Sequence, residues 1–275
     1  MGLQVSGNLE YFCFSDFHDK VTQAIFTRKG GVSPHPWLSL NLGGTVGDTR
    51  EHVVENRRRM FSALGIPVES LFDVWQVHSA NVICSDHPRP LDQPHQKADA
   101  IITNRPGVTL FMRFADCVPI LLHDPKKKVV GLVHAGWQGT VKKVVQSAVS
   151  QMNQVYGSQP EDIQAGIGPS IGPDHYEIGA DVSDLILNTF GQYTKQILRS
   201  SNGNIFLDLW RANQVLLEGM GVKSIEISGF CTACDINRWY SHRAEKGKTG
   251  RFGAIIRLNP ILAKEDETTD DADFR

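Results

Sequence analysis

His78, Cys117 and His134 are the residues of this sequence whose chemical types best suit metal binding. They lie in the segments QVHS (76–79), ADCVP (115–119) and VHAGW (133–137), each beside an apolar run that predicts a strand. A thiolate and two imidazoles form a borderline-soft donor set that suits zinc, and the same donors would accept copper. Three protein ligands leave a fourth position open, which is typical of catalytic zinc. We therefore predict a zinc site with an open position at the ends of strands.

Other interpretations of these residues remain open at the level of the sequence. The three side chains are far apart along the chain, so Cys117 could be a small buried hydrophobe and the histidines could be satisfied by hydrogen bonds. Cys117 and His134 could instead act as a nucleophile and its base. Asp116 could carry protons in catalysis, or it could orient a histidine ligand, and we favour the second role.

Strands and helices alternate along the chain, which predicts an α/β or α+β fold with one mixed sheet. Apolar residues at helical spacing predict a helix over 141–156, begun by Thr140 as N-cap and ended by Gly157. Two more helices are predicted over 48–64, capped by Asp48, and over 208–220. Runs rich in Val, Ile and Phe predict strands over 21–28, 72–78, 109–114, 118–123, 129–134, 163–167, 224–229 and 252–258.

Composition narrows the class of protein. The 275 residues are 41% hydrophobic and 21% charged, with a net charge of -2, so no overall basic field would recruit nucleic acid or an anionic membrane. No stretch has the apolar length of a membrane span. Five cysteines in so long a chain are not a disulfide framework and favour a reducing cytoplasm. We expect one domain over 1–263, followed by a disordered acidic tail over 264–275.

Segments of this sequence resemble, in order, those of the polyphenol-oxidase or laccase-domain family. Members of that family are described as multifunctional purine nucleoside phosphorylases, and one bacterial branch is called peptidoglycan editing factor. The matching segments are TRKGGVS (27–33), SLNLG (39–43), NR (56–57), QVH (76–78), ADA (98–100), ADCVPI (115–120), HAGWQGT (134–140), IGPSIG (167–172), CT (231–232), SHR (241–243) and TGR (249–251).

The resemblance implies a fold, a site and a reaction. The fold would be a single domain of mixed sheet layers flanked by helices, similar to the laccase-domain and cysteine-hydrolase folds. His78, Cys117 and His134 would be the metal ligands. The reaction would be phosphorolysis of adenosine, inosine and S-methyl-5'-thioadenosine to the free base and ribose 1-phosphate or 5-methylthioribose 1-phosphate, with an adenosine deaminase side activity. Partners would be nucleosides and phosphate, with neither nucleic acid nor membrane, for a monomer or homodimer.

Phosphorolysis requires groups that bind phosphate, ribose and base, and each candidate also has a structural explanation. The guanidinium groups suit phosphate, although any of these cations could be an ordinary ion-pair residue. Amides could bind ribose or base, or cap turns. Trp137 could stack on a base or belong to the core. The candidates are Lys29, Arg57, Arg243 and Arg251 for phosphate, Asn41 and Gln76 for ribose or base, and Trp137 and Cys231 for the wall of the site.

Two sequence features bear on other activities. None of the ten histidines has another histidine two residues away, so the His-X-His pairs of multicopper oxidases are missing and we treat copper-dependent polyphenol oxidation as a minor alternative. An amide hydrolase that edits peptidoglycan precursors is the other alternative. Cys231 and Cys234 form a single CxxC, which excludes a zinc ribbon built from two such motifs, and we interpret Cys234 as structural.

Overall fold

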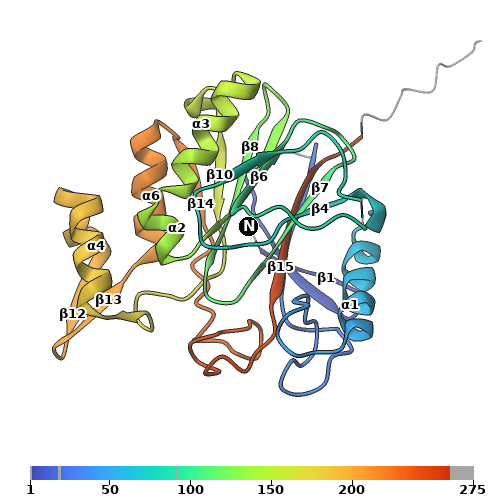
Figure 1. The fold of residues 1–275 in the computed structure, drawn as a ribbon, viewed down its shortest axis with the longest axis horizontal. Coiled ribbons are helices and arrows are strands. Elements are labelled where there is room, and N and C mark those ends of the chain that lie inside the picture. Colours follow the sequence, from blue (N-terminus) through green and yellow to red (C-terminus); the bar gives the residue numbers. More distant parts are fainter. Residues whose placement is uncertain (1, 18–19, 91, 261–275) are drawn as a thin grey trace, which may run out of the picture.

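The chain folds into four layers in the order helix, sheet, sheet, helix (Figure 1). This computed structural model describes residues 2–17, 20–90 and 92–260. The tail predicted over 264–275 lies outside the described residues. The α/β prediction is confirmed as a single domain of mixed sheets flanked by helices, with two large sheets in place of the one expected.

The first large sheet contains both ends of the described chain. Its strands pair antiparallel except for β4, which runs parallel to β7. In spatial order they are β1 (Gly2–Ser6), β2 (Leu9–Cys13), β3 (Val21–Phe26), β15 (Phe252–Leu258), β7 (Thr109–Phe114) and β4 (Leu71–Asp73). Helix α1 (Arg50–Ala63) covers the outer face of this sheet.

The second large sheet lies at the centre of the molecule. Its order is β14 (Ser224–Ile227), β10 (Gln164–Ile167), β8 (Val118–Asp124), β9 (Val129–Ala135), β6 (Ala100–Thr103) and β5 (Val82–Cys84). Side chains alternate along β9 because successive residues of a strand point to opposite faces. Val130 and Leu132 pack between the two sheets. Val129 and Val133 pack under the outer helices. Both faces of β9 are buried, as the continuous apolar run indicates.

The outer helices on the second sheet are α3 (Val144–Tyr156) and α6 (Leu209–Met220). The helix predicted over 141–156 is α3, which begins at Val144 because Lys143 adopts the left-handed conformation with φ 62°. A short helix that was not predicted, α2 (Trp137–Val141), precedes it. Thr140 is therefore not a cap, and its hydroxyl accepts a hydrogen bond from Asn213. Gly157 ends α3 as predicted, with φ 72°.

The other two predicted helices are present, and the N-cap of one of them is not the residue predicted. Asp208 caps α6 by accepting a hydrogen bond from the backbone N–H of Arg211. Thr49 rather than Asp48 caps α1, because the carboxylate of Asp48 is bound by Ser33, Asn41 and His52. Elements without a sequence prediction are β1, β2, β5, β6, the short helices α4 (Ala180–Phe190) and α5 (Thr194–Ile197), and a small sheet of β11 (Glu177–Ile178), β13 (Asn204–Leu207) and β12 (Leu198–Ser201).

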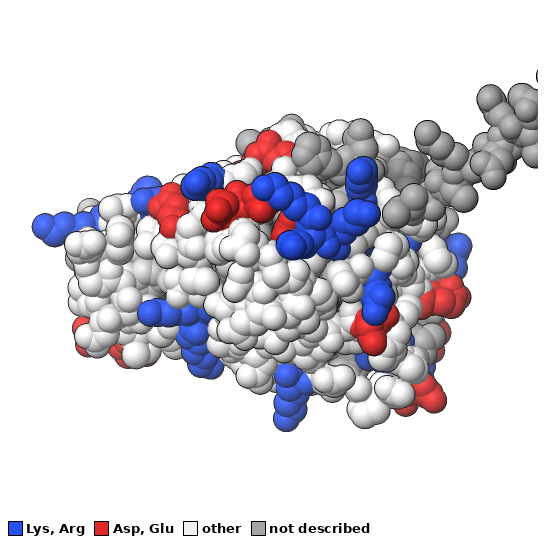
Figure 2. Space-filling model, turned by 90° about the horizontal axis from the view of Figure 1, so that it is seen from above, with Lys and Arg blue, Asp and Glu red and all other residues white. Residues whose placement is uncertain are grey.

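The surface carries charges of both signs. On the face in Figure 2, Lys and Arg side chains lie among Asp and Glu, beside a broad uncharged area. In the described part of the chain, no helix is long and apolar enough to cross a membrane.

A candidate metal centre

His78, Cys117 and His134 converge, although 56 residues separate the first from the last in sequence. Their donor atoms all lie within 4.8 Å of one another. Nε2 of His78 is 3.9 Å from Sγ of Cys117, and the two imidazole rings are 5.0 Å apart between centroids. The β8–β9 register, in which Val118 is opposite Ala135, places Cys117 at the end of β8 beside the end of β9 that carries His134. The three side chains thus lie close together, as predicted.

Asp99 organises two of the three candidate ligands. Its Oδ1 accepts a hydrogen bond of 2.8 Å from Nδ1 of His134 and one of 3.0 Å from the backbone N–H of His78. Because Nδ1 of His134 donates to a carboxylate, Nε2 is the nitrogen left to bind a metal. The carboxylate also accepts bonds from the backbone of Val77 and from both the backbone and hydroxyl of Ser79.

The segment that carries His78 is a loop and not the strand predicted over 72–78. Strand β4 ends at Asp73, and the backbone N–H groups of Val77, His78 and Ser79 are bound by Asp99 in place of a neighbouring strand. His78 has φ 57°, a left-handed conformation that is uncommon outside glycine and is found at functional sites. The prediction that all three side chains lie at strand ends is therefore wrong for His78.

The electrostatics of the site favour a thiolate. Burial opposes ionisation of Cys117, but the charge of His134 and hydrogen bonds from both histidines outweigh burial and lower the pKa of the thiol to about 6. Burial also opposes the charged form of His134, yet Cys117 and Asp99 raise its pKa to about 9. Hydrogen bonds from His134 and Ser79 hold the pKa of Asp99 well below its usual range, despite burial. Without metal, Cys117 and His134 form a thiolate–imidazolium pair.

The donors and the space around them fit a zinc ion. Two neutral imidazoles and a thiolate are ligands that zinc prefers, and Asp99 supplies the outer hydrogen bond that such histidines usually make. Gly136 keeps the site open, because a Cβ there would lie 2.7 Å from Sγ of Cys117 and 3.2 Å from Cδ2 of His78. The identity of the metal does not follow from the donors alone, since copper also binds His and Cys.

Asp116 has a different role from the one predicted. Its Oδ1 accepts a hydrogen bond of 2.7 Å from the hydroxyl of Thr232, and its Oδ2 accepts one of 2.6 Å from the backbone N–H of Arg243. These hydrogen bonds go to Thr232 and Arg243 and not to a histidine ligand, so Asp99 and not Asp116 orients His134. Asp116 instead connects the segment before Cys117 to the long segment between β14 (Ser224–Ile227) and β15 (Phe252–Leu258), which contains both Thr232 and Arg243.

Two of the predicted cations lie close to the candidate ligands. Burial lowers the pKa of Arg251, and the charges of Cys117 and Asp116 oppose this change. Arg243 is held through its backbone by Asp116, and its guanidinium lies 5.0 Å from the ring of Tyr176. Burial and the charge of Cys117 both raise the pKa of Tyr176, so this phenol keeps its proton at neutral pH. Arg251 and Tyr176 thus lie within electrostatic range of Cys117, whereas the guanidinium of Arg243 packs on Tyr176 and donates to the carbonyl of Glu177.

The other predicted phosphate-binding cations are engaged elsewhere. Lys29 forms an ion pair of 3.2 Å with Glu10. Arg57 lies over the ring of Phe111, donates to the carbonyl of Leu42 and is 4.0 Å from Asp73.

The predicted amide, indole and thiol groups also have structural contacts. Asn41 is buried and holds the backbone N–H of Arg251 at 2.9 Å. Gln76 makes two hydrogen bonds to the backbone of Arg113 and anchors the loop of His78 to β7. Trp137 packs against the core beneath the outer helices. Cys231 belongs to a second group of polar side chains with His175 and Cys234.

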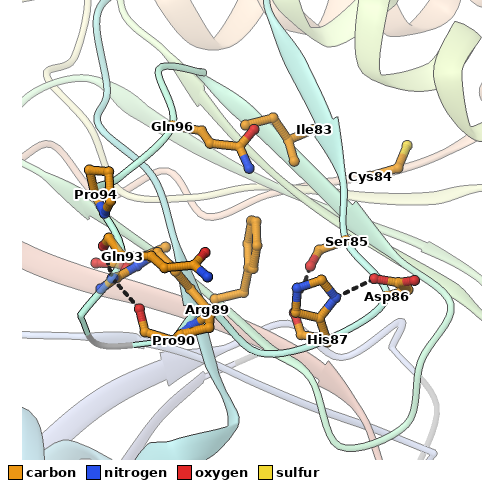
Figure 3. Close-up of a pocket in the computed structure, with 12 residues that line it drawn as sticks. Ile83, Cys84, Ser85, Asp86, His87, Arg89, Pro90, Gln93, Pro94 and Gln96 are labelled. Atoms are coloured by element: carbon orange, nitrogen blue, oxygen red, sulfur yellow. Dashed lines mark hydrogen bonds and ion pairs between the residues drawn. The ribbon is translucent and has the colours of Figure 1, made fainter.

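Two hollows in the surface do not contain the three donors. A pocket of about 90 Å³ is lined by residues from β4, β5 and the following loop, among them Asp73, Ser85, His87 and Arg89 (Figure 3). It is smaller than the roughly 300 Å³ at which ligand pockets begin, so a nucleoside would not fit in it. A shallow groove of about 620 Å³ between Asn81 and Lys142 lies against the loop of His78, and Nζ of Lys142 donates to the carbonyl of His78.

Comparison with known proteins shows the family of this chain. The model of the family "Multi-copper polyphenol oxidoreductase laccase" matches residues 22–259. The chain belongs to this laccase family. A relative from Deinococcus radiodurans, named purine nucleoside phosphorylase, is 40% identical over 86% of this chain and 89% of its own. Purine nucleoside phosphorylase YlmD of Bacillus subtilis is 35% identical over 87% of this chain and 89% of its own.

Solved structures of other laccase-family proteins have the same fold. YlmD from Geobacillus stearothermophilus aligns with a TM-score of 0.88 and 34% identity over 94% of this chain and 98% of its own. A Bacillus licheniformis protein described as hypothetical protein YfiH aligns with a TM-score of 0.87 and 32% identity over 94% and 99%. The resemblance inferred from the motifs is confirmed.

Sequence reasoning missed Asp99, Ser79 and Lys142 as parts of the centre. Asp99 lies in the ADA segment (98–100), which matches the laccase family, and that match was the available signal. Ser79 adjoins His78, and its hydroxyl donates 2.7 Å to Asp99. Nothing in the local sequence around Lys142 indicates its bond to the loop of His78.

Proposed function

We propose that this chain is a purine nucleoside phosphorylase that acts at the centre formed by His78, Cys117 and His134. The observation that carries the proposal is the convergence of these three donors, one buried and two half-buried, with both histidines held by Asp99. Relatives that align over most of the chain are named purine nucleoside phosphorylases, which supports the same reaction class. Adenosine, inosine and S-methyl-5'-thioadenosine are the substrates we propose, with adenosine deamination as a side activity.

In phosphorolysis, a phosphate oxygen attacks C1' of the ribose, the bond from C1' to N9 of the purine breaks, and the base leaves with a proton. Arg243 and Arg251 would hold the phosphate, because guanidinium groups match its oxygens. Arg251 interacts electrostatically with Cys117, and the backbone of Arg243 is bound by the neighbouring Asp116. Tyr176 keeps its proton and is our candidate for the hydrogen-bond donor to the departing base. Asn41 positions Arg251 by accepting a hydrogen bond from its backbone N–H.

His78, Cys117 and His134 would hold the metal, which we propose to be zinc. A zinc ion at this place supplies a Lewis acid and lowers the pKa of a bound water, the property that deamination needs. Hydrogen bonds within the chain fix the positions of the ligands. Asp99 accepts a hydrogen bond from Nδ1 of His134 and so keeps that nitrogen protonated, and the hydroxyl of Ser79 donates to Asp99. Asp116 has both carboxylate oxygens engaged, so we assign it to positioning and not to proton transfer.

Base release from adenosine with and without phosphate tests the proposal. The zinc-loaded protein is expected to give adenine and ribose 1-phosphate only when phosphate is present, and Cys117→Ala should lose both the zinc of this centre and the activity. Cys84→Ala is the matched control, because Cys84 lies in β5 away from the centre. Fully loaded protein that releases no base with phosphate present would refute the phosphorylase assignment.

Arg251→Gln separates phosphate binding from the chemical step. We expect the KM for phosphate to rise at least about tenfold, since a charge-assisted hydrogen bond contributes about 1.5–3 kcal/mol. The KM for adenosine should change much less. Equal changes in both values would remove Arg251 from the phosphate site.

A second candidate function rests on the same residues. Cys117, His134 and Asp99 have the order of contacts of a cysteine hydrolase triad, with a lowered thiol pKa, a base beside it and a carboxylate on the far nitrogen of the imidazole. An amide hydrolase acting on peptidoglycan precursors would use this arrangement without metal. Activity that persists after metal removal and is abolished by alkylation of one thiol would favour the hydrolase.

A further inference from the structure

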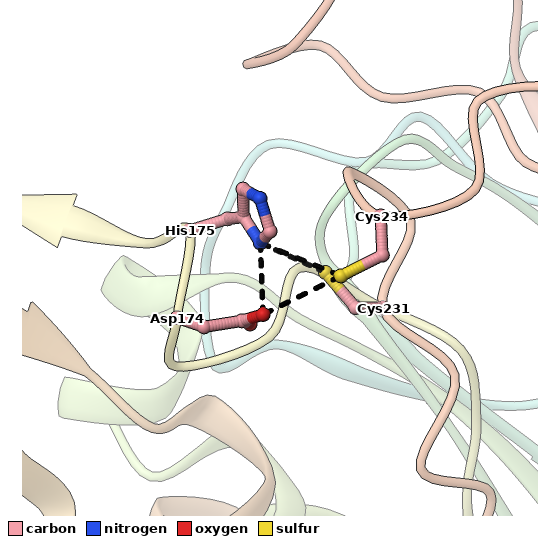
Figure 4. A group of neighbouring side chains, drawn as sticks. All are labelled: Asp174, His175, Cys231 and Cys234. Carbon is pink, nitrogen blue, oxygen red and sulfur yellow. Dashed lines mark hydrogen bonds and ion pairs between the residues drawn. The ribbon is translucent and has the colours of Figure 1, made fainter.

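A second group of metal-binding side chains lies outside the centre just described. Asp174, His175, Cys231 and Cys234 bring one carboxylate, one imidazole and two thiols within 4.8 Å of one another (Figure 4). The first two come from the loop after β10, and the two cysteines come from the loop after β14. All five cysteines of the chain are free, so both thiols are available as ligands.

The distances within this group match the edges of a tetrahedron around zinc. Nδ1 of His175 lies 3.7 Å from Sγ of Cys231 and 3.5 Å from Sγ of Cys234. Oδ2 of Asp174 lies 3.4 Å from Sγ of Cys234 and 3.1 Å from Nδ1 of His175. Zinc bonds of about 2.3 Å to sulfur and about 2.0–2.2 Å to nitrogen or oxygen, at tetrahedral angles, place such donors roughly 3.3–3.8 Å apart. The three distances to sulfur lie in this range, and the distance of 3.1 Å between His175 and Asp174 is slightly shorter.

The backbone around these side chains is shaped to hold them close together. The N–H of Gly172 donates to Sγ of Cys231 at 3.1 Å, a bond that stabilises a thiolate ligand. A Cβ at Gly172 would lie 2.7 Å from Oδ1 of Asp174 and 3.1 Å from Cβ of Cys231, so only glycine fits without displacement. The CxxC spacing is one that zinc sites use.

We propose that Asp174, His175, Cys231 and Cys234 form a second, four-ligand site for zinc, with a structural role. Four protein donors leave no open position, in contrast to the three at the first centre. Binding would release the protons of the two thiols to solvent. The ion would join the loop after β10 to the loop after β14.

The second site adjoins the loops that hold Asp116. Ile171, in the first loop, donates its backbone N–H to the carbonyl of Asp116 at 3.0 Å. Thr232, next to Cys231, donates its hydroxyl to the carboxylate of Asp116 at 2.7 Å. Zinc at the second site would thus restrain both contacts to the residue that precedes Cys117.

Metal counting in variants tests the second site independently of the first. Cys117→Ala removes a ligand of the first centre, so this variant, purified with zinc under a phosphine reductant, should keep one zinc per chain. Adding Cys234→Ala or His175→Ala should remove that zinc or weaken its binding more than about 100-fold, beyond the loss typical of outer-shell changes. Adding Cys84→Ala is the control and should leave the zinc in place.

Cobalt substitution identifies the ligands by their spectra. Cobalt added to Cys117→Ala protein should give thiolate charge-transfer bands and the intense visible bands of tetrahedral geometry, and Cys234→Ala should reduce the thiolate bands. The side chains of Asp174 and His175 are 58% and 43% exposed, so Asp174→Asn and His175→Ala should not disturb the core if the cysteine variants fail to fold. Zinc should raise the melting temperature of Cys117→Ala and not that of the Cys117→Ala, His175→Ala protein.

Three results would overturn the second site. They are a Cys117→Ala protein without zinc, zinc that persists unchanged when Cys234 and His175 are replaced, or cobalt bound without thiolate bands. Because these measurements use no nucleoside, they stand whether or not the phosphorylase proposal holds.

Discussion

Nδ1 of His134 donates a hydrogen bond of 2.8 Å to Oδ1 of Asp99, whose carboxylate also binds three successive backbone N–H groups of the loop that carries His78. One buried carboxylate therefore sets the positions of both histidines. The arrangement resembles the carboxylate–histidine–metal contacts in which the outer carboxylate fixes the tautomer and the direction of the ring.

Replacing Asp99 with asparagine is expected to weaken metal binding about 10–100-fold, the usual range for outer hydrogen-bond partners. The amide keeps the size of the side chain but has one acceptor oxygen and no charge. Asp124→Asn is a matched control, because Asp124 is a buried carboxylate that binds two backbone N–H groups at the far end of the β8–β9 hairpin. Competition with a chromogenic chelator gives the affinity. Equal losses in the two variants would assign Asp99 to stability alone.

Gly136→Ala should reduce metal binding and activity, because its Cβ would lie 2.7 Å from Sγ of Cys117. Gly219→Ala, in α6, is the control: the nearest atom to its new Cβ is Nε2 of Gln146, at 3.7 Å. Alanine is favoured over glycine inside helices by about 1 kcal/mol, so the control should unfold at the same or a higher temperature. Full metal occupancy in Gly136→Ala would show that the centre tolerates the added methyl group.

In the metal-free protein, Cys117 should react with iodoacetamide as a thiolate. Its lowered pKa, about 6, means that the thiolate is present above that pH and is protonated below it, whereas an ordinary thiol ionises near pH 8.5. The midpoint of alkylation rate against pH should lie near 6 and rise in His134→Gln, which removes the main charge that favours ionisation. Cys117→Ala corrects for the other thiols. A wild-type midpoint near 8.5 would contradict the thiolate–imidazolium pair.

Asp73→Asn should destabilise the fold strongly, by about 3–5 kcal/mol, as is usual when a buried charge loses its partner. The buried carboxylate lies 2.7 Å from Nε of Arg89, 3.1 Å from Nε2 of His95 and 3.5 Å from Arg113. These groups hold the pKa of Asp73 below its usual range despite burial. The stabilisation is therefore present above the unfolded pKa, near 4, and is lost as the pH falls below it.

Urea unfolding at pH 7 and at lower pH measures the contribution of Asp73. Asp86→Asn is the control, because Asp86 pairs with His87 on the surface, where solvent screens the ion pair and its contribution to stability is small. If the two variants unfold at the same urea concentration, the Asp73 cluster contributes nothing beyond a surface pair.

Sequence patterns predicted the central elements better than the peripheral ones. The runs that became β8, β9 and β15 are apolar and long enough to identify, because both of their faces are buried. Strand β12 (Leu198–Ser201) is mostly exposed and polar, so it carries no hydrophobic signal. The break between α2 and α3 falls at Lys143, whose left-handed conformation nothing in its own chemistry indicates.

The sequence by itself determined which side chains could bind a metal, because thiolate and imidazole chemistry belongs to the residue. It also placed Cys117 and His134 beside apolar strands. Only the tertiary structure decided that Asp99, and not Asp116, orients His134, since that choice depends on the register of β6 against β9, in which Ala100 is opposite Val133. Likewise, it alone brought Asp174 and His175 to Cys231 and Cys234. Such contacts join residues 35 to 60 positions apart. Sheet register and loop packing set these contacts, and local periodicity does not encode either.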